Sequence, residues 1–518
     1  MRKGSGCVGC PLQSVGTDMV PDEVVPGAKV YLLKHVPDDD TITENVFFPL
    51  AGLVRGEHVS IGHLIRCRTS SVLDTATHRA VVEHCARAYE RIPESTELVI
   101  AQGKEPWQST QGRTDLSIGD WRGFIGPRHY RGQLPVYAVL HLDDLKLGKS
   151  PELTLPSKLD WAKVPRILKK EWPQPFPPRL MVGQADHNAV CKWFQTAHKD
   201  AEYLLWDTEY FYDVDNPYVE SNYQLTMLSV TYPGADAGIQ MCYVGGYAEP
   251  WQKHHFITEF AVLARSKRHV GHNFPAEIRS TEKTFGFKPE WFWNRFDDSM
   301  HAHAELWSEL PHTLEFLESV CSPHPKMKHL PTTDPDRNWG DTVVTGHVWN
   351  MLHDELKRDP DAMRNYREQR LKLTKHIYTR ESLGLRVNKA RVAPAIEMYQ
   401  SKIDDAECLA QAYCGWGINL GASQQLGYWL YDVEQLKVQK SKNKHTKAAR
   451  STDKDAIASL RASVLPFDGD YEANNSITQE YVEQRLKDGA HPLLEAKVLF
   501  SEAEQVMGHY LKPLIVKE

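Results

Sequence analysis

The sequence predicts a multidomain α/β protein whose C-terminal part is mostly α-helical. Three observations lead to this prediction. The chain has 518 residues, which is enough for about three domains of ordinary size. A proline-rich stretch, EWPQPFPPRL (171–180), interrupts it and predicts a stiff linker, because it cannot continue a helix. After about residue 360, apolar residues recur every three to four positions, as in long packed helices.

The composition is that of a globular protein in a reducing cytosol. Hydrophobic residues make up 41% of the chain and charged residues 25%. No run approaches 18 apolar residues and the first 30 residues hold no apolar signal core, so we expect no membrane helix, no secretion and a cytoplasmic location. The net charge of −7 gives no overall attraction to nucleic acid, so contacts to DNA would need local basic patches.

Four cysteines of the first 100 residues have the pattern of a metal site. Cys7 and Cys10 are separated by two residues, and Cys67 is followed 18 positions later by Cys85. Two well-separated pairs of thiolates suit either a zinc ion or an iron–sulfur cluster. The remaining cysteines lie in apolar contexts, and we expect them to be small buried hydrophobic residues. They are Cys191, Cys242, Cys321, Cys408 and Cys414.

The first domain, residues 1–170, resembles the iron–sulfur uracil-DNA glycosylases. The stretches that carry the resemblance are, in order, GCVGCPL, VVPGAKVYLL, FFPLAGLVR, LIRCR, EHCARAY, LVIAQG, WRGFIG and VYAVLHLDDL. The resemblance implies an α/β fold and a [4Fe–4S] cluster held by four cysteines. These would be Cys7, Cys10, Cys67 and Cys85.

The catalytic motifs of that family are altered here. Its GE-A-PG loop is replaced by KHVPDDD (34–40), and its HPS motif reads HLD (141–143), in which His141 matches. Asp38, Asp39 and Asp40 could supply a general base, although adjacent aspartates at a turn more often form a solvated cap. Base excision needs a closed pocket and a stabilised leaving group. We therefore expect the glycosylase-like fold without release of uracil.

The second domain, residues 181–360, is predicted to be an α/β domain with a metal site. An amphipathic helix pattern leads into the apolar strand that ends in Asp-Thr-Glu, and LTMLSVTYP and IQMCYVGGY alternate as neighbouring strands do. Asp207 and Glu209 are two positions apart, so both carboxylates face the same side of a strand. Hard oxygen ligands of this kind suit Mg²⁺ or Mn²⁺.

This domain resembles the RNase H-like 3′–5′ proofreading exonucleases of the DEDD class. The stretches DTE, RHVGHNFPAEIRS and NWGDTVVTGHVWNML carry the resemblance. It implies that the catalytic carboxylates, which bind two metal ions, are Asp207, Glu209, Glu277 and Asp341. Glu277 stands where the family usually has Asp.

The third motif of that class leaves two registers open. Arg337 stands where the family usually has Tyr, four residues before Asp341. His329 and Asp334 offer the HxxxxD spacing of the histidine subclass. We favour Asp341, because the residues after it have the pattern of an amphipathic helix, whereas LPTTDPD around Asp334 is typical of a loop.

Residues 361–518 resemble the thumb of family A DNA polymerases. The resemblance rests on GINLGASQQLGYWLYD, STDKDAIASL and HPLLEAKVLFSEAEQVMGHYLKPL. Between the first two lies the basic stretch KVQKSKNKHTKAAR, in which we expect a phosphate grip on duplex DNA. Its residues are Lys440, Lys442, Lys444, Lys447 and Arg450. An HDE triplet with Asp354 and Glu355 imitates a palm motif, but it precedes the thumb and is expected to be a solvated helical face.

The three resemblances together are to the N-terminal part of a viral, phage-type family A DNA polymerase, with palm and fingers absent from this chain. They imply a metal-dependent 3′–5′ exonuclease that acts on primer–template DNA and single-stranded 3′ ends in the host cytoplasm. A separate palm-and-fingers chain would dock on the last helix, around Val506, Tyr510 and Leu514. The alternative is a non-catalytic DNA-binding and assembly subunit with decayed sites. Active uracil excision is a third, less favoured interpretation.

Overall fold

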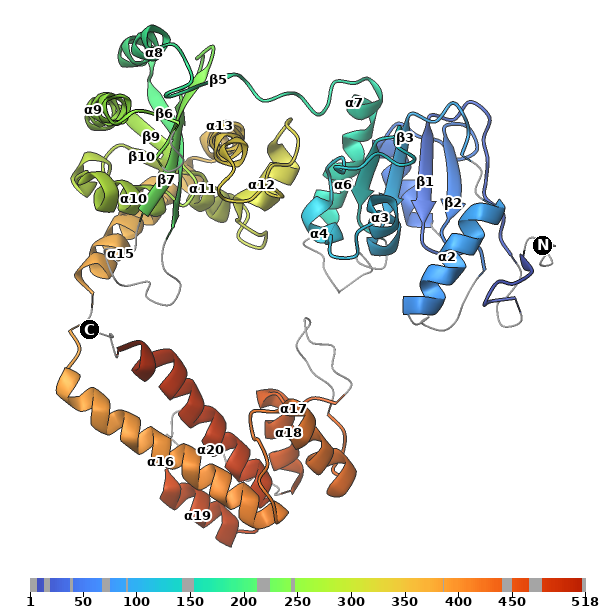
Figure 1. Cartoon of the computed structure of the whole chain (residues 1–518), viewed down its shortest axis with the longest axis vertical. Helices are drawn as coiled ribbons and strands as arrows, with labels where there is room; N and C mark the ends of the chain where they lie inside the picture. The colour runs from blue at the N-terminus through green and yellow to red at the C-terminus, as the bar shows by residue number, and fades with distance from the viewer. Residues whose placement is uncertain are drawn as a thin grey trace. The chain divides into compact units, whose positions relative to one another are not determined.

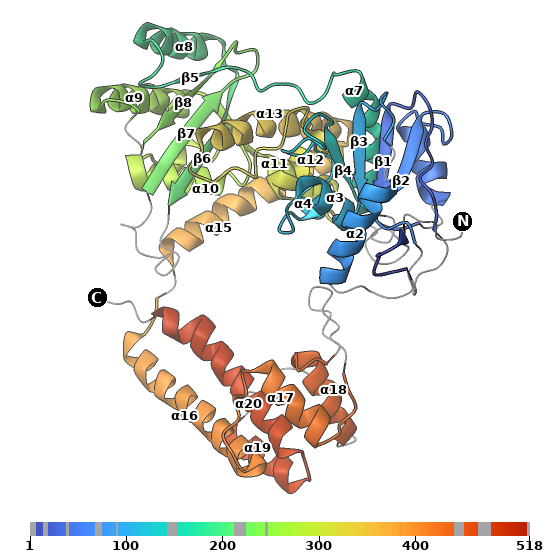
Figure 2. The same cartoon turned by 45° about the vertical axis from the view of Figure 1, so that its right-hand side comes forward.

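The structure is a computed structural model of the chain. It describes residues 7–13, 19–37, 41–67, 75–89, 92–141, 153–211, 224–243, 247–384, 386–439, 450–464 and 478–514. The chain divides into two compact units, Met1–Ser382 and Leu383–Glu518, called unit 1 and unit 2 below. Unit 1 is α/β and holds two sheets, whereas the described part of unit 2 is helical (Figures 1 and 2). No helix among the described residues is long and apolar enough to cross a membrane.

The first sheet of unit 1 is parallel, with the strand order β2-β1-β3-β4. Its strands are β1 (Val30–Lys34), β2 (Val59–His63), β3 (Leu98–Gln102) and β4 (Val136–Val139). Every residue in these strands is buried, as expected of a parallel sheet covered on both faces. The helices of this domain are α1 (Phe48–Leu50), α2 (Thr75–Tyr89), α3 (Lys104–Gln111), α4 (Ile118–Trp121), α6 (Thr154–Ala162) and α7 (Val164–Leu168).

The carboxyl ends of these parallel strands carry buried polar side chains, although the rest of each strand is largely apolar. Lys34 ends β1, His63 ends β2 and Gln102 ends β3. A cavity of about 540 Å³ opens here, and Lys34, His63, Thr43 and Phe48 are among the residues that line it. Ligands of open α/β sheets bind at this edge. The cavity therefore lies at the edge of the sheet where a ligand of such a fold would bind.

The second sheet of unit 1 is mixed, with the strand order β10-β9-β6-β7-β8-β5. Its strands are β5 (Arg179–Met181), β6 (Tyr203–Phe211), β7 (Gln224–Thr231), β8 (Gly238–Cys242), β9 (Arg268–Gly271) and β10 (Phe296–Asp298). Strands β6, β7 and β8 are antiparallel neighbours, while β9 runs parallel to β6, and β10 to β9. The helices of this domain are α8 (His187–Asp200), α9 (Pro250–Ser266), α10 (Pro275–Phe285), α11 (Ser299–Leu306), α12 (Leu314–Cys321), α13 (Pro335–Arg358), α14 (Pro360–Asn365) and α15 (Leu371–Leu383).

Alternation along β6 directs successive side chains to opposite faces of this sheet. Trp206 packs edge-on against Phe260 of α9, with the ring centroids 5.2 Å apart. Leu205, on the other face, meets α13 at Gly346, where an added Cβ would lie 2.9 Å from Leu205 Cδ1. Glycine thus allows α13 to lie close against the strand. Asp207 shares this face with Leu205 and therefore points toward α13.

The two domains of unit 1 have separate hydrophobic cores and meet in a buried polar seam. Arg122 Nη1 lies 2.7 Å from Asp160 Oδ2, and Arg122 Nη2 donates to Ser319 Oγ of α12 at 2.8 Å. Lys163 donates to the carbonyl groups of Gly123 and Ser319. Burial lowers the pKa of Lys163 to about 8. The contacts across the boundary between the domains are those of Arg122 and Lys163 with Ser319.

Unit 2 packs its helices around a third core. They are α16 (Lys389–Cys414), α17 (Ser423–Tyr428), α18 (Lys454–Val464), α19 (Gln479–Lys487) and α20 (Pro492–Val506). Helices α16 and α20 lie side by side and run in opposite directions (Figure 1). Arg461 of α18 binds Glu495 of α20 through two hydrogen bonds of 2.8 and 2.7 Å, and both side chains are buried. This bidentate pair fixes α18 to α20.

Candidate active site

Three carboxylates converge between β6 and α13. Asp207 and Glu209 leave the same face of β6, and a register shift against β7 follows directly after Glu209. Asp341 comes from the second turn of α13, which crosses this face of the sheet. One carboxylate oxygen of each residue lies within 4.8 Å of the other two. The separation suits a shared divalent cation, which brings carboxylate oxygens from different elements together.

Asn338 links the two elements that carry these carboxylates. Its amide donates to Asp207 Oδ2 at 2.8 Å and to the Asp207 carbonyl at 3.2 Å. Gln240 in turn donates to Asn338 Oδ1 at 3.0 Å, which holds the amide in this orientation. Asn338 lies three residues before Asp341, on the same side of α13. Its role was not predicted from the sequence, although this spacing was a usable signal.

Two cationic side chains border the cluster. Lys328 Nζ lies 2.5 Å from Asp341 Oδ2. Arg337 Nε lies 3.6 Å from Glu209 Oε1, and its Nη1 donates to the carbonyl of Leu330. Arg337 therefore faces the cluster from the position where Tyr was expected. Lys328 was not predicted, because it lies on the loop before α13 and belongs to none of the recognised motifs.

Burial and mutual repulsion make the cluster costly to ionise. Burial raises the pKa of Asp207 well above its usual value, and the charges of Asp341 and Glu209 raise it further. Burial, followed by the charge of Asp341, raises the pKa of Glu209 to about 7, even though Arg337 and Lys328 oppose the shift. A bound cation would remove this penalty, because an opposite charge favours the ionised form.

Glu277 lies in the first turn of α10, beside the three carboxylates but outside their 4.8 Å group. Burial, then the charge of Asp207, raises its pKa well above the usual value. Its Oε2 has no hydrogen-bond partner among the described residues. Asp298 fixes the turn before α10 by accepting from the backbone of Asn273 at 3.1 Å and of Phe274 at 2.8 Å. Glu277 is thus a buried carboxylate with capacity for a ligand.

The residues of the alternative register lie elsewhere. Asp334 is the N-cap of α13 and accepts from the backbone of Asp336 at 2.8 Å. The ring of His329 lies 5.2 Å from that of Trp121, in the four-stranded domain. Within the described part of the chain, neither joins a group of candidate metal ligands. Asp341 is therefore the residue of the third motif that meets Asp207 and Glu209.

All four cysteines of the N-terminal pattern are buried in the four-stranded domain. Cys10, Cys67 and Cys85 belong to one core, and Cys85 interacts electrostatically with Cys10. Among the described residues, no three of their sulfur atoms lie within 4.8 Å of one another. Four thiols in one domain are the number of ligands that either a zinc ion or an iron–sulfur cluster takes.

Of the other five cysteines, four differ from the expected buried hydrophobic residue, among them Cys321 and Cys414, which are half-buried. Cys408 is exposed, because it lies on the solvent side of α16. Cys191 is half-buried on α8, where its thiol contacts two histidines. Cys242 is buried as expected.

Several predicted glycosylase and polymerase features lie partly outside the described residues. This holds for Asp38, Asp39 and Asp40, and for Lys440, Lys442, Lys444 and Lys447. Arg450 is described and pairs with Asp432 at 2.7 Å. His141 lies against Gly103, where an added Cβ would be 3.0 Å from its Cβ. Asp354 and Glu355 pair with lysine and arginine one turn along α13, as a solvated helical face does.

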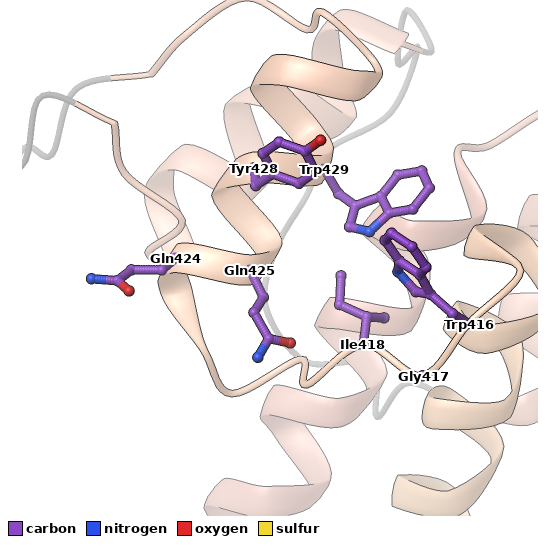
Figure 3. Close-up of a pocket in the computed structure, with 7 residues that line it drawn as sticks. All are labelled: Trp416, Gly417, Ile418, Gln424, Gln425, Tyr428 and Trp429. Carbon is purple, nitrogen blue, oxygen red and sulfur yellow. The ribbon is translucent and has the colours of Figure 1, made fainter.

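Unit 2 carries an aromatic hollow of about 370 Å³. Trp416, Trp429 and Ile418 point toward one another there, whereas Gln424 points away (Figure 3). The rings of Trp416 and Trp429 meet edge to face at 5.9 Å, and Trp416 is 60% exposed. At the end of α20, Tyr510 is also largely exposed. Exposed rings of this kind can stack on bases or on apolar side chains.

Comparisons with known proteins leave the function to be argued from the site. No protein-family model matches the sequence, and no curated protein matches it. Among solved structures, the chain is similar to the POL domain of Pol1 from M. smegmatis in complex with DNA primer–template and dNTP. The TM-score is 0.42 and the identity 16%, over 64% of this chain and 48% of that chain. The chain thus spans about half the length of that structure.

Proposed function

We propose that the chain is a DNA-replication protein with a metal-dependent 3′–5′ exonuclease site in unit 1. The observation that carries the proposal is the group formed by Asp207, Glu209 and Asp341, in which Asp341 is buried and the other two are half-buried, with Glu277 beside it. The resemblance to DEDD exonucleases assigns the same four residues. Geometry and motifs thus point independently to one set of carboxylates.

The residues fit Mg²⁺ or Mn²⁺. Their ligand atoms are hard oxygens on two rigid elements, and their raised pKa values make the metal-free cluster unfavourable when ionised. The orphaned Oε2 of Glu277 provides a further ligand atom. When bound, the metal ions would generate the attacking hydroxide and stabilise the leaving oxygen of the 3′-terminal phosphodiester.

The neighbouring side chains have separate tasks in this proposal. Asn338 orients Asp207 through its amide. Lys328 offsets part of the negative charge at Asp341. Arg337, at the mouth of the cluster beside Glu209, would bind a non-bridging oxygen of the substrate phosphate, a role that suits a guanidinium group. Each is a positioning or binding residue, and the carboxylates carry the chemistry.

Unit 2 would bind the DNA duplex. The basic stretch that ends at Arg450 supplies charges for phosphates, and the rings of the aromatic hollow supply stacking surfaces. We further propose that the chain works with a family A palm and fingers, carried by another chain that docks around Val506, Tyr510 and Leu514. Tyr510 is the most exposed apolar residue of this segment.

The four-stranded domain would bind a [4Fe–4S] cluster and would not excise uracil. Four buried cysteines in this domain support the cluster, which would tie the N-terminal segment to α2. The cavity at the strand ends is large enough for a base. Its altered motifs favour binding without cleavage.

A second candidate function is a non-catalytic DNA-binding subunit. The observation in its favour is that Lys328 and Arg337 already neutralise part of the carboxylate cluster. If these cations replace the metal permanently, the site is structural. The fold and the DNA contacts would then be retained without nuclease activity.

Digestion of a 3′-labelled single strand, with and without Mg²⁺, distinguishes the two functions. We expect digestion that depends on the metal and that is at least ~100-fold slower in Asp207→Asn and Asp341→Asn. Loss of a residue that only supports a metal ligand already costs up to about 100-fold, so loss of a ligand itself should cost at least as much. Asp334→Asn is the matched control on the same helix and should retain activity. Wild-type protein that is inactive with Mg²⁺ and with Mn²⁺ would support the non-catalytic subunit.

A further inference from the structure

A second group of metal-ligating side chains lies on α8 and α9. His187 and Cys191 are four residues apart on α8, so their side chains share one face of the helix. His255 projects from α9, which lies beside α8 (Figures 1 and 2). The ligand atoms of the three residues all lie within 4.8 Å of one another. None of the three belongs to β6 or α13, which carry the carboxylate cluster.

The distances in this group match those of a tetrahedral metal site. Cys191 Sγ lies 3.4 Å from His187 Nε2 and 3.5 Å from His255 Nε2. Metal–sulfur bonds of about 2.3 Å and metal–nitrogen bonds of about 2.0–2.1 Å, at the tetrahedral angle, place sulfur and nitrogen about 3.6 Å apart. A thiol can donate to one ring and accept from the Nε2–H of the other, and a metal ion would replace both hydrogen bonds with the three ligand atoms already in place.

We propose that His187, Cys191 and His255 bind Zn²⁺ and leave a fourth position open. Two imidazoles and one thiolate are ligands for zinc and similar borderline metals, whereas Mg²⁺ and Ca²⁺ take oxygen ligands. Three protein ligands with a water or an external ligand in the fourth position are a recurrent arrangement for zinc. All three side chains are half-buried, so the ion can enter from solvent.

The surroundings of the group favour a fixed geometry. The ring of Trp251 meets His187 edge to face at 4.8 Å, and that of Phe194 meets His255 edge to face at 6.2 Å. Farther along the same two helices, His198 Nε2 lies 3.2 Å from Glu259 Oε2. Rings that are held by aromatic neighbours lose little freedom when they bind a metal. The zinc ion would clip α8 to α9 at the start of both helices.

Thiol protection tests the site in the wild-type chain. Metal-depleted protein is alkylated in the absence and presence of Zn²⁺, and each cysteine is followed by peptide mass spectrometry. We expect Zn²⁺ to slow alkylation of Cys191 at least tenfold. Cys408 is exposed and is the internal control, whose rate should not change. A rate for Cys191 that is the same at saturating Zn²⁺ overturns the proposal.

Metal content of two neighbouring variants tests the same site independently. His255→Asn should lose one zinc per chain relative to wild type, whereas His254→Asn, the adjacent exposed histidine of α9, should lose none. The cysteines of the N-terminal domain are present in both, so any metal that they bind cancels in the comparison. Cys191→Ser keeps the side-chain size and should also lose one zinc. Equal zinc content in all three variants and wild type would contradict the assignment.

Discussion

Replacing Glu209 with Gln should stabilise the metal-free protein at high pH while removing its response to Mg²⁺. Burial raises the pKa of Glu209 from 4.5 to about 7, and the side chain is only 15% exposed. A folded-state pKa above the unfolded value means that the stabilising effect of the proton is complete below pH 4.5 and is lost as the pH rises through 7. Since each pKa unit corresponds to about 1.4 kcal/mol, ionised Glu209 costs the folded state about 3 kcal/mol near pH 8.

Hydrogen exchange on peptides from β6 and α13 is the appropriate measurement, because unfolding of a multidomain chain is not a single transition. In metal-free protein, Glu209→Gln should protect these peptides by up to about 3 kcal/mol near pH 8 and by little near pH 5. Mg²⁺ should protect wild type and not the variant. Glu202→Gln, at the exposed residue just before the same strand, is the control. A difference between Glu209→Gln and wild type that is the same at both pH values would refute this reasoning.

Three further predictions concern the other parts of the chain. Cys67→Ala should abolish the brown colour and the iron content of anaerobically purified protein, about four irons per chain in wild type; retained iron would exclude Cys67 as a ligand. Glu495→Ala should destabilise unit 2 by about 3–5 kcal/mol, because it leaves Arg461 buried without its partner; protection of α18 and α20 that is unchanged in hydrogen exchange would contradict this. Neutralising the basic stretch should lower the log–log salt dependence of primer–template binding by about 0.9 for each phosphate that the protein no longer neutralises, as measured by fluorescence anisotropy; an unchanged slope would exclude the stretch from the interface. The residues to replace together are Lys440, Lys442 and Lys444.

Local sequence patterns predicted individual strands and helices well. The apolar run that ends in Asp-Thr-Glu is β6, and the two alternating stretches after it are β7 and β8. The pattern after Asp341 lies within α13, which begins at Pro335 with Asp334 as its cap. The helix thus begins six residues before Asp341, earlier than the pattern indicated, although Asp followed by Pro at the first helical position is a strong local signal for a helix start.

Contacts between distant segments were not predictable in the same way. Asp207 and Asp341 meet only because α13 crosses one face of the six-stranded sheet, and motif resemblance was the only earlier indication. Lys328 completes the site from a position outside the recognised motifs, and Asn338 does so from within the stretch NWGDTVVTGHVWNML, in which only Asp341 had been given a role. The group on α8 and α9 was missed because His255 is far from Cys191 in the sequence. The two ligands of this group that lie on α8 have the spacing His-x₃-Cys, which could be recognised in the sequence.

The proline-rich stretch between the domains also differs from a simple tether. Trp172 is buried and donates from its indole nitrogen to the carbonyl of Ser322 at 3.4 Å. The carbonyl of Pro177 accepts from Trp339 at 2.9 Å. The apolar residues among these prolines show no regular spacing in the sequence. Their burial depends on contacts with segments far along the chain, so it could not be predicted from the local pattern.

The polar seam in unit 1 limits how this protein can change by recombination. Domains joined by a flexible linker without mutual contacts can be exchanged between genes with little loss of stability. Here an exchange of either domain would remove Ser319 from Arg122 and Lys163, so each of these buried charges would lose a hydrogen bond that only the matching domain provides. The two domains of unit 1 are therefore expected to be inherited as one module, with substitutions on one side of the seam matched by substitutions on the other.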